Sequence, residues 1–329
     1  MSRLVEVRDL RREFVVRRAT GRLRREKRVV SAVDGITFGI GAGECVGYIG
    51  ANGAGKSTTI KMLTGILVPT AGEVRVAGLE PVRQRRQLAR RIGVVFGQRS
   101  QLWWDLPLAE SFRLLAAIHR LGEREGRERL AECVELLELT PFLGTPVRQL
   151  SLGQRMRGEV TAALLHSPGL LFLDEPTIGL DIVSKERLRR FLIDERQRRG
   201  TTILLTTHDL PDIERLCDRI LVVDAGRLVF DGDLPALATE VGARRMLIVD
   251  LTEPTAPLTA IAGCTLLGVE ADGLRQQLAL DGDRPIASVL AEISGRATLR
   301  DLTVAEPRIE EVVAQLYDRA AGAGRADPA

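Results

Sequence analysis

A glycine-rich segment early in the chain constrains its fold more than any other feature. The segment GANGAGKS at residues 50–57 fits the pattern GxxxxGK[ST], and it lies between an apolar strand-like run and a helical pattern at 58–64. In that context backbone N–H groups turn inward on phosphate oxygens, and the start of the helix adds positive potential. Lys56 is predicted to reach the β- and γ-phosphates of a nucleotide, and Ser57 to bind Mg²⁺. A purely structural glycine turn is the alternative, but the chain has so few lysines that a chance match would be rare.

Short apolar runs alternate with helical patterns up to about residue 240, which is typical of an α/β fold. The runs are continuous rather than alternating, as expected of parallel strands whose two faces are both covered by helices. These runs are residues 44–49, 91–96, 170–174, 201–207 and 219–224. Between residues 99 and 150 the strands stop and apolar residues recur at helical spacing, which predicts a helical insertion.

The pattern restarts after residue 240 with the strand-like runs MLIVDL and LRQQLAL. It closes with a helical stretch in which Ile309, Val312, Val313 and Leu316 share one face. We therefore expect an α/β domain at 1–240, with a helical subdomain at about 99–150, and a small α+β domain at 241–329. The length of 329 residues agrees with two domains of roughly 150 residues each.

A second motif is the apolar run LLFLD, which ends in Asp174 and is followed by Glu175. Ligands bind at the carboxyl ends of the strands in open α/β sheets. Asp174 is predicted to hold Mg²⁺, directly or through water, and Glu175 to act as the general base that polarises the attacking water. Strands often end in acidic residues, so this pair gains its meaning from the phosphate loop that precedes it.

A third motif, LSLGQ at residues 150–154, comes 20 residues before the acidic strand end. Ser151 and Gln154 are spaced as a helix-capping box, and Ser151 with Gly153 at a helix N-terminus also makes a good anion site. Here the chain resembles the ATP-binding-cassette (ABC) ATPases, whose signature LSGGQ occupies this place. Leu152 replaces the first glycine of that signature, which is a common variation.

The resemblance covers roughly residues 3–235 and implies an ABC cassette: a RecA-like P-loop NTPase core with a helical subdomain. It also implies roles for four single residues. Gln98, at a strand end, would bind Mg²⁺ and take part in catalysis, and His208, at the end of the next strand after the acidic pair, would contact the γ-phosphate. Asp181 would lie near the nucleotide, and Phe14 would stack on adenine. The full set expected to bind ATP is Phe14, Gly50, Ala51, Asn52, Gly53, Ala54, Gly55, Lys56, Ser57, Thr58, Ser151, Gly153, Gln154 and Asp181.

In ABC ATPases two copies work together, and the signature of one closes over the nucleotide held by the other. The resemblance implies that the Ser151 helix acts in trans. It also implies that ATP holds a dimer together, most simply a homodimer, and that hydrolysis loosens this dimer.

The segments FGQRSQLWWDLP at 96–107 and EPRIEEV at 306–312 resemble ATPase subunits of ABC-2-type exporters, including drug-export members. That resemblance implies separate integral membrane permease subunits and a place at the cytoplasmic face of the membrane. Trp103 and Trp104 would anchor the permease contact, with simple core packing as the alternative.

Two other functions stay open at this point. An ABC importer ATPase shares all the core motifs, although the C-terminal segment and the tryptophan stretch favour export. A soluble ABC ATPase without a transport role would usually carry two cassettes or a coiled-coil insertion, and the sequence has one cassette and no sustained heptads. A GTPase would need an NKxD motif, which does not occur in the sequence.

Charge and composition restrict the remaining possibilities. Residues 11–28 hold nine basic and two acidic residues. A solvated loop, a contact with anionic lipid headgroups or a membrane partner, and a nucleic-acid contact are the three interpretations of this basic segment. We expect no nucleic-acid partner, because no aromatic residue for base stacking occurs in 15–37.

Four dispersed cysteines without a CxxC motif argue against disulfide bonds and a zinc site. Neither a secretory signal nor a membrane span is recognisable in the sequence.

Overall fold

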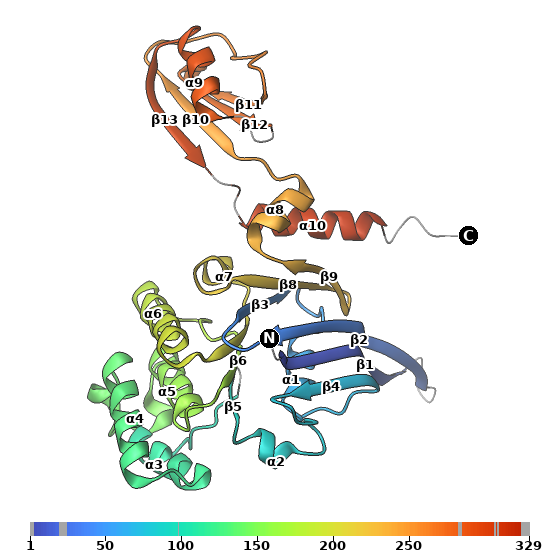
Figure 1. Cartoon of the computed structure of the whole chain (residues 1–329), viewed down its shortest axis with the longest axis vertical. Helices are drawn as coiled ribbons and strands as arrows, with labels where there is room; N and C mark the ends of the chain where they lie inside the picture. Colours follow the sequence, from blue (N-terminus) through green and yellow to red (C-terminus); the bar gives the residue numbers. More distant parts are fainter. Residues whose placement is uncertain are drawn as a thin grey trace. The chain divides into compact units, whose positions relative to one another are not determined.

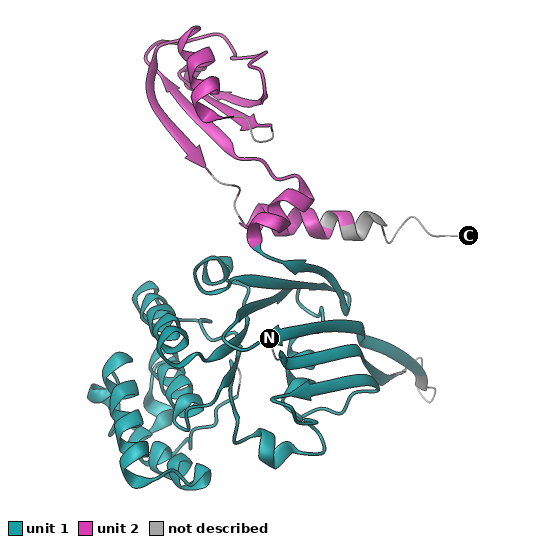
Figure 2. Ribbon diagram, in the orientation of Figure 1, with its two compact units in different colours: residues 1–233 teal, residues 234–329 magenta. Residues whose placement is uncertain are grey.

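The computed structural model describes residues 3–19, 25–97, 99–281, 285–305, 307 and 309–323. The chain divides into two compact units, unit 1 at 1–233 and unit 2 at 234–329 (Figure 2). The boundary therefore lies at 233/234 rather than at the predicted 240/241. The reason is that helix α8 (Leu234–Val241) packs against helix α10 (Ile309–Ala323), and the Arg319 guanidinium donates hydrogen bonds to the carbonyl oxygens of Glu240 and Val241.

The main sheet of unit 1 has six strands in the order β5-β6-β7-β3-β8-β9. Figure 1 labels β3, β5, β6, β8 and β9 of this sheet. Neighbouring strands run parallel except for β9, which is antiparallel to β8. The central strands are buried on both faces, as the continuous apolar runs predict. The strand bounds are β3 Cys45–Gly50, β5 Ile92–Phe96, β6 Leu170–Asp174, β7 Thr202–Thr206, β8 Arg219–Asp224 and β9 Arg227–Gly232.

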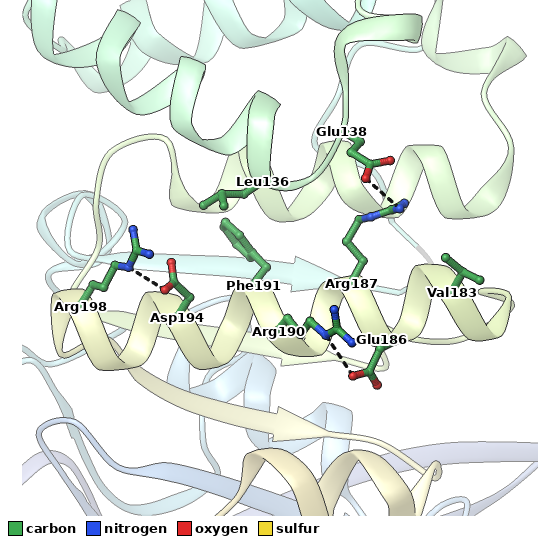
Figure 3. A pocket seen from close by; sticks show the side chains of 9 residues that line it. All are labelled: Leu136, Glu138, Val183, Glu186, Arg187, Arg190, Phe191, Asp194 and Arg198. Carbon is green, nitrogen blue, oxygen red and sulfur yellow. Dashed lines mark hydrogen bonds and ion pairs between the residues drawn. The ribbon is translucent and has the colours of Figure 1, made fainter.

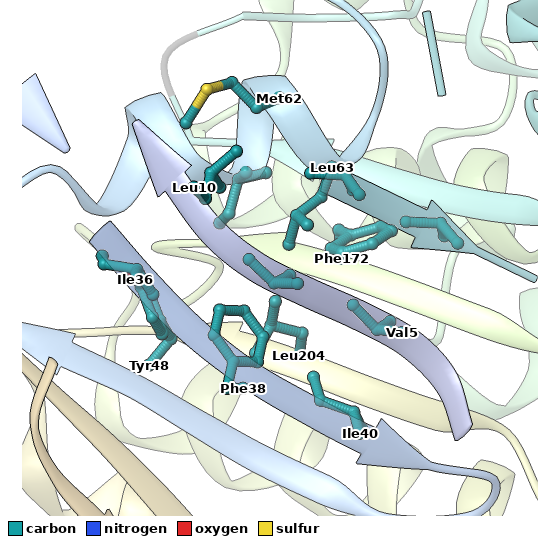
Figure 4. Packing of buried hydrophobic residues seen from close by; sticks show 14 of the residues in the cluster. Val5, Leu10, Ile36, Phe38, Ile40, Tyr48, Met62, Leu63, Phe172 and Leu204 are labelled. Carbon is teal, nitrogen blue, oxygen red and sulfur yellow. The ribbon is translucent and has the colours of Figure 1, made fainter. Parts of the chain in front are cut away.

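A second, antiparallel sheet covers one side of unit 1 in the order β2-β1-β4. Its strands are β1 (Arg3–Ala19), β2 (Arg25–Gly41) and β4 (Ala71–Val76). The main hydrophobic core draws on both sheets and on helix α1 (Lys56–Leu63), as Figure 4 shows for Phe38, Leu63 and Phe172. This core fixes the strand that precedes the phosphate loop and the helix that follows it.

The basic segment 11–28 is not a loop over the residues that the structure describes. Residues 11–19 belong to β1 and residues 25–28 to β2, and the two strands pair in register out to Ala19 and Arg25. Of the three interpretations of this segment, the solvated loop is therefore wrong for these residues. β-Branched residues explain the difference, because Val15 and Val16 lie across from Val29 and Arg28 and favour an extended backbone.

The helices of unit 1 include the predicted helical insertion. Within it, α3 and α4 are followed by two short 3₁₀ turns at 140–142 and 147–149, and α5 begins just after the predicted bounds. Cys133 and Leu137 are buried there, and Arg129 of α4 is buried beside them. The helix bounds are α2 Arg85–Leu88, α3 Leu108–His119, α4 Glu123–Leu136, α5 Leu152–Leu164, α6 Ile182–Arg199 and α7 Leu210–Leu216.

Unit 2 is the small α+β domain that the sequence predicts. Its antiparallel sheet has the order β11-β12-β10-β13, and Val289 and Ile293 of helix α9 belong to the core of that sheet. The apolar face predicted for the final helix is confirmed, since all four of its residues are buried. The remaining bounds are β10 Met246–Leu251, β11 Cys264–Glu270, a 3₁₀ turn at 271–273, β12 Arg275–Leu280, α9 Ile286–Ser294 and β13 Leu299–Ala305.

Within the described part of the chain, none of the helices has the length and apolar character that crossing a lipid bilayer requires. In the same residues none of the four cysteines forms a disulfide bond.

Candidate nucleotide-binding site

The phosphate loop connects the end of β3 to the start of α1, and its glycines are there for steric reasons. Gly55 has a φ of 101°, and a Cβ at this position would come within 2.4 Å of the Ala32 carbonyl oxygen. Gly53 has a φ of 87° and no atom within 4 Å of where its Cβ would be, so the loop is open on that side. Only glycine adopts such a backbone without strain. A loop of this kind generally forms a cradle in which main-chain N–H groups bind phosphate oxygens.

Lys56 lies inside this cradle. Its ammonium group donates hydrogen bonds to the carbonyl oxygens of Gly50 at 2.6 Å and Ala51 at 3.1 Å. Burial lowers the pKa of Lys56, while the carboxylates of Glu175 and Asp174 act in the opposite direction. The ammonium therefore sits where phosphate oxygens can replace the loop carbonyls as its partners.

Asp174 ends β6 beside the first turn of α1. Its Oδ1 accepts hydrogen bonds from the Thr206 hydroxyl at 2.7 Å and the Ser57 hydroxyl at 3.3 Å. A carboxylate and a hydroxyl oxygen that face each other are the donor types that Mg²⁺ prefers, so the residues present fit this ion. Both line a cavity of about 170 Å³. Gln98 lies outside the described residues, and its predicted role stays a prediction.

Glu175 and His208 meet at the ends of neighbouring strands β6 and β7. The His208 Nδ1 lies 2.7 Å from the Glu175 Oε2. Glu175 has a φ of 56°, and its backbone N–H donates to the Thr206 carbonyl oxygen at 2.9 Å. With this left-handed backbone conformation, the Glu175 side chain lines the same cavity as the phosphate loop. The imidazole is two-thirds exposed, with 66% of its side chain accessible.

One cavity of about 560 Å³ is lined by Glu175, His208 and the phosphate loop. Its described lining residues are Ala32, Asn52, Gly53, Gly55, Lys56, Ser57, Thr58, Glu175, Ile178 and His208. Ala32, Ile178 and Thr206 were not predicted from the sequence. Ala32 and Ile178 carry no chemical signature, and the role of Thr206 depends on β7 lying beside β6.

Ser151 and Gln154 form the capping box that begins α5. The Ser151 Oγ accepts from the Gln154 N–H at 3.2 Å, and the Gln154 Oε1 accepts from the Ser151 N–H at 2.9 Å. Neither residue nor Gly153 is among the described residues that line the phosphate-loop cavity of the same chain. Leu152, the departure from the signature pattern, fills the space beside Gly179, where a Cβ would come within 2.3 Å of its methyl group. Contact of this segment with a partner's nucleotide stays a prediction.

Several other predicted residues are not among the described residues that line this cavity: Gly50, Ala51 and Ala54 of the phosphate loop, and also Asp181 and Phe14. Asp181 caps helix α6, since its carboxylate accepts hydrogen bonds from the backbone N–H of Ser184 at 2.9 Å and its hydroxyl at 2.6 Å. Hydrogen bonds from Ser184 hold the pKa of Asp181 below its usual value. Phe14 lies in β1 with the Arg12 guanidinium 4.6 Å from its ring centroid, and the structure does not bring it into the described lining of the phosphate-loop cavity. The predicted nucleotide contacts of these five residues stay predictions.

A larger cavity, of about 600 Å³, lies along α6 and has a different character (Figure 3). The three arginines drawn there already pair with carboxylates of the same cavity: Arg187 with Glu138, Arg190 with Glu186, and Arg198 with Asp194. Because carboxylates compensate the charges of these arginines, this cavity is poorly suited to binding phosphate. The phosphate-loop cavity is therefore the better nucleotide site.

Comparisons with known proteins agree with this geometry. The family described as ABC transporter matches residues 33–178. A daunorubicin resistance ATP-binding protein of Streptomyces coeruleorubidus is 35% identical over 296 residues, which cover 87% of this chain and 90% of that protein. The chain belongs to the ATP-binding subunits of ABC transporters. A Nod factor export ATP-binding protein of a Rhizobium species is also 35% identical, over 87% of this chain and 92% of its own.

Solved structures support the same assignment. This subunit is similar to the ATP-binding subunit of an ABC transporter, with a TM-score of 0.62 and 28% identity over 73% of this chain and 93% of that one. It is also similar to a dimeric ATP-binding cassette in a post-hydrolysis state bound to ADP and Pi, with a TM-score of 0.60 and 25% identity over 70% and 98% of the two chains. The predicted cassette fold is confirmed, and the protein is an ATPase coupled to transport.

Proposed function

We propose that two copies of this subunit hydrolyse ATP to power an ABC-2-type exporter, and that Glu175 is the general base. The observation that carries the catalytic part is the Glu175–His208 pair, 2.7 Å apart, on the same cavity as the phosphate loop. In this reaction a water oxygen attacks the γ-phosphorus, Glu175 accepts the water proton, and the bond to the β-phosphate oxygen breaks with its electrons leaving on ADP. Lys56 holds the β- and γ-phosphates in place.

Mg²⁺ completes this site in our proposal. Ser57 and Asp174 would hold it, joined by Gln98, and it would neutralise charge on the phosphate oxygens. The Thr206 hydroxyl orients Asp174 for this task, because it donates to the same carboxylate oxygen that Ser57 contacts. Thr206 thus acts on the ligand rather than on the ion.

The transport role rests on the relatives and on one surface. The relatives named above are involved in daunorubicin resistance and Nod factor export, which favours export over import. Trp103 and Trp104 are 36% and 52% exposed, so they are not core residues. Their backbones are fixed, since the Ser111 hydroxyl accepts from the Trp103 N–H and the Arg148 N–H donates to the Trp104 carbonyl. Exposed aromatic side chains on a rigid backbone are good anchors for a membrane permease subunit at the cytoplasmic face.

Replacing Glu175 by Gln tests the catalytic proposal. Glutamine keeps the size of the side chain but cannot accept the proton, so turnover should fall by roughly 10²–10⁴-fold while ATP stays bound. Phosphate release measures the first effect. Size-exclusion chromatography with ATP should show a more stable dimer, because the nucleotide that joins the two copies is no longer consumed.

The control is Glu214→Gln, the same change at an exposed position of α7. It should leave both turnover and dimerisation unchanged. Rapid hydrolysis by Glu175→Gln would refute the assignment of the base, and a monomeric variant in ATP would argue against the ATP-bridged dimer.

A further inference from the structure

Asp212 is a buried carboxylate behind the catalytic pair, and none of the motifs accounts for it. It lies in α7 with none of its surface exposed. Its Oδ2 accepts a hydrogen bond from the Thr177 hydroxyl at 2.6 Å and a longer one from the Thr207 hydroxyl at 3.4 Å. Its Oδ1 accepts from the Arg189 Nε at 2.6 Å. One carboxylate thus joins three segments: the one after β6, helix α6 and the one after β7.

Two of these segments carry the catalytic pair. Thr177 follows Glu175 by two residues, and Thr207 directly precedes His208. Both threonines are almost fully buried, at 3% and 2% exposure. Thr207 also accepts the N–H of Asp209 at 2.9 Å, which fixes the backbone on the other side of His208. The carboxylate therefore holds the backbone beside both members of the pair.

The third segment is helix α6. Arg189 contacts Asp212 and lies 3.5 Å from Asp209, while Lys185 forms an ion pair with Asp209. These cations tie the His208 loop to the helix that begins directly after Asp181. The His208 side chain is mostly exposed, and Glu175 is the side chain it contacts. Its position therefore depends on the backbone that this network holds.

We propose that Asp212, through Thr177 and Thr207, is a positioning residue that keeps Glu175 and His208 at their catalytic separation. It touches neither the phosphate loop nor the reacting atoms. Loss of a hydrogen bond to Asp212 moves one catalytic group relative to the other, and small misplacements of catalytic groups are costly. Nucleotide binding depends on the phosphate loop, which Asp212 does not contact, so binding should persist. The proposal rests on the role of Glu175 proposed above.

Thr177→Val tests this role without removing a charge. Valine has the shape of threonine but lacks the hydroxyl that donates to Asp212, and the Arg189–Asp212 ion pair stays in place. We expect kcat to fall about tenfold with the KM for ATP unchanged. Thr177→Ser restores the hydroxyl, so it should recover most of the wild-type kcat.

The matched control is Thr161→Val in α5. Thr161 is fully buried and its hydroxyl donates to the Arg157 carbonyl oxygen at 3.0 Å, away from the network. It should lose thermal stability to a similar degree and keep its kcat. A purely structural role for the Thr177 hydroxyl would lower the melting temperatures of both valine variants and leave both kcat values alike.

The outcomes separate this proposal from the one it rests on. An unchanged kcat in Thr177→Val, a loss matched by Thr161→Val, or no recovery in Thr177→Ser overturns the positioning role. Glu175→Gln, measured in the same assay, tests the base itself. If Glu175→Gln hydrolyses ATP at the wild-type rate, the base assignment fails; if it is inactive while Thr177→Val is normal, only the role of Asp212 fails.

Discussion

The buried ion pair between Arg129 and Glu195 offers a quantitative test of what holds the helical subdomain on the core. Arg129 of α4 and Glu195 of α6 have side chains that are each 3% exposed and lie 2.7 Å apart. The Arg129 Nε also donates to the Leu164 carbonyl oxygen at the end of α5. Replacing Arg129 by Met removes the cation and leaves the Glu195 carboxylate buried.

The expected loss in the free energy of unfolding depends on the partners that Glu195 keeps in this variant. Its remaining partners are the Thr201 hydroxyl at 3.3 Å and the Arg199 Nε at 3.6 Å, both longer contacts than the one lost. Breaking a buried pair from one side costs about 3–5 kcal/mol, and the residual contacts place Arg129→Met near the lower limit, at about 3 kcal/mol. For a unit of this size, that lowers Tm by roughly 6–12 °C.

Urea unfolding followed by tryptophan fluorescence measures this loss in unit 1. The two tryptophans of the chain, Trp103 and Trp104, both lie in that unit. The control is Arg124→Met on the same helix, where Arg124 pairs with Glu128 at 3.7 Å with both side chains largely exposed. Such a surface pair contributes about 0–1 kcal/mol.

The double variant Arg129→Met with Glu195→Met provides the second comparison. It removes both charges, so it should be less destabilised than Arg129→Met alone. Two results would refute the reasoning: Arg129→Met lowers the free energy of unfolding no more than Arg124→Met does, or the double variant is the least stable of the three. In either case the unpaired Glu195 carboxylate is not the cause of the loss.

Three further variants test other parts of the structure. Lys56→Ala should weaken ATP binding about tenfold or more, because it deletes a charged contact with phosphate; an unchanged Kd in a calorimetric titration would contradict the phosphate-loop assignment. Burial and the neighbouring His119 lower the pKa of His166 to about 4. The unfolded chain therefore takes up a proton first as pH falls below about 6.5, and the free energy of unfolding should drop by about 1 kcal/mol between pH 7.5 and 5.5. His166→Gln should remove this part of the pH dependence, and an identical pH profile would count against it. Trp104→Ala should leave basal ATP hydrolysis intact but reduce stimulation by reconstituted membrane subunits; equal stimulation would exclude Trp104 as an anchor.

Local sequence patterns predicted many residues of the candidate site. The phosphate loop is readable because the backbone of Gly55 and the charge of Lys56 are properties of single residues in one short segment. The acidic pair at Asp174 and Glu175 is readable because a continuous apolar run marks the end of a buried strand. The parallel sheet and the helical insertion follow from the same continuous and periodic patterns, and the structure confirms both.

The pairing of β1 with β2 shows where composition misleads. Nine basic residues in 18 favour a solvated loop, but strand pairing depends on which residues lie opposite each other. The register aligns Val15, which lies inside the basic segment, with Val29, which directly follows it. No local pattern in a single sequence fixes such a register.

By itself the sequence predicted the type of chemistry: a triphosphate cradle, a carboxylate for the metal and a carboxylate for the water, each encoded within a few consecutive residues. Only the tertiary structure decided how they are held. Thr206 reaches Asp174 because β7 lies beside β6, and Asp212 reaches Thr177 from 35 residues away. Hydrogen bonds between distant segments depend on strand order and helix packing, which come from burial of the whole core rather than from any local run of residues.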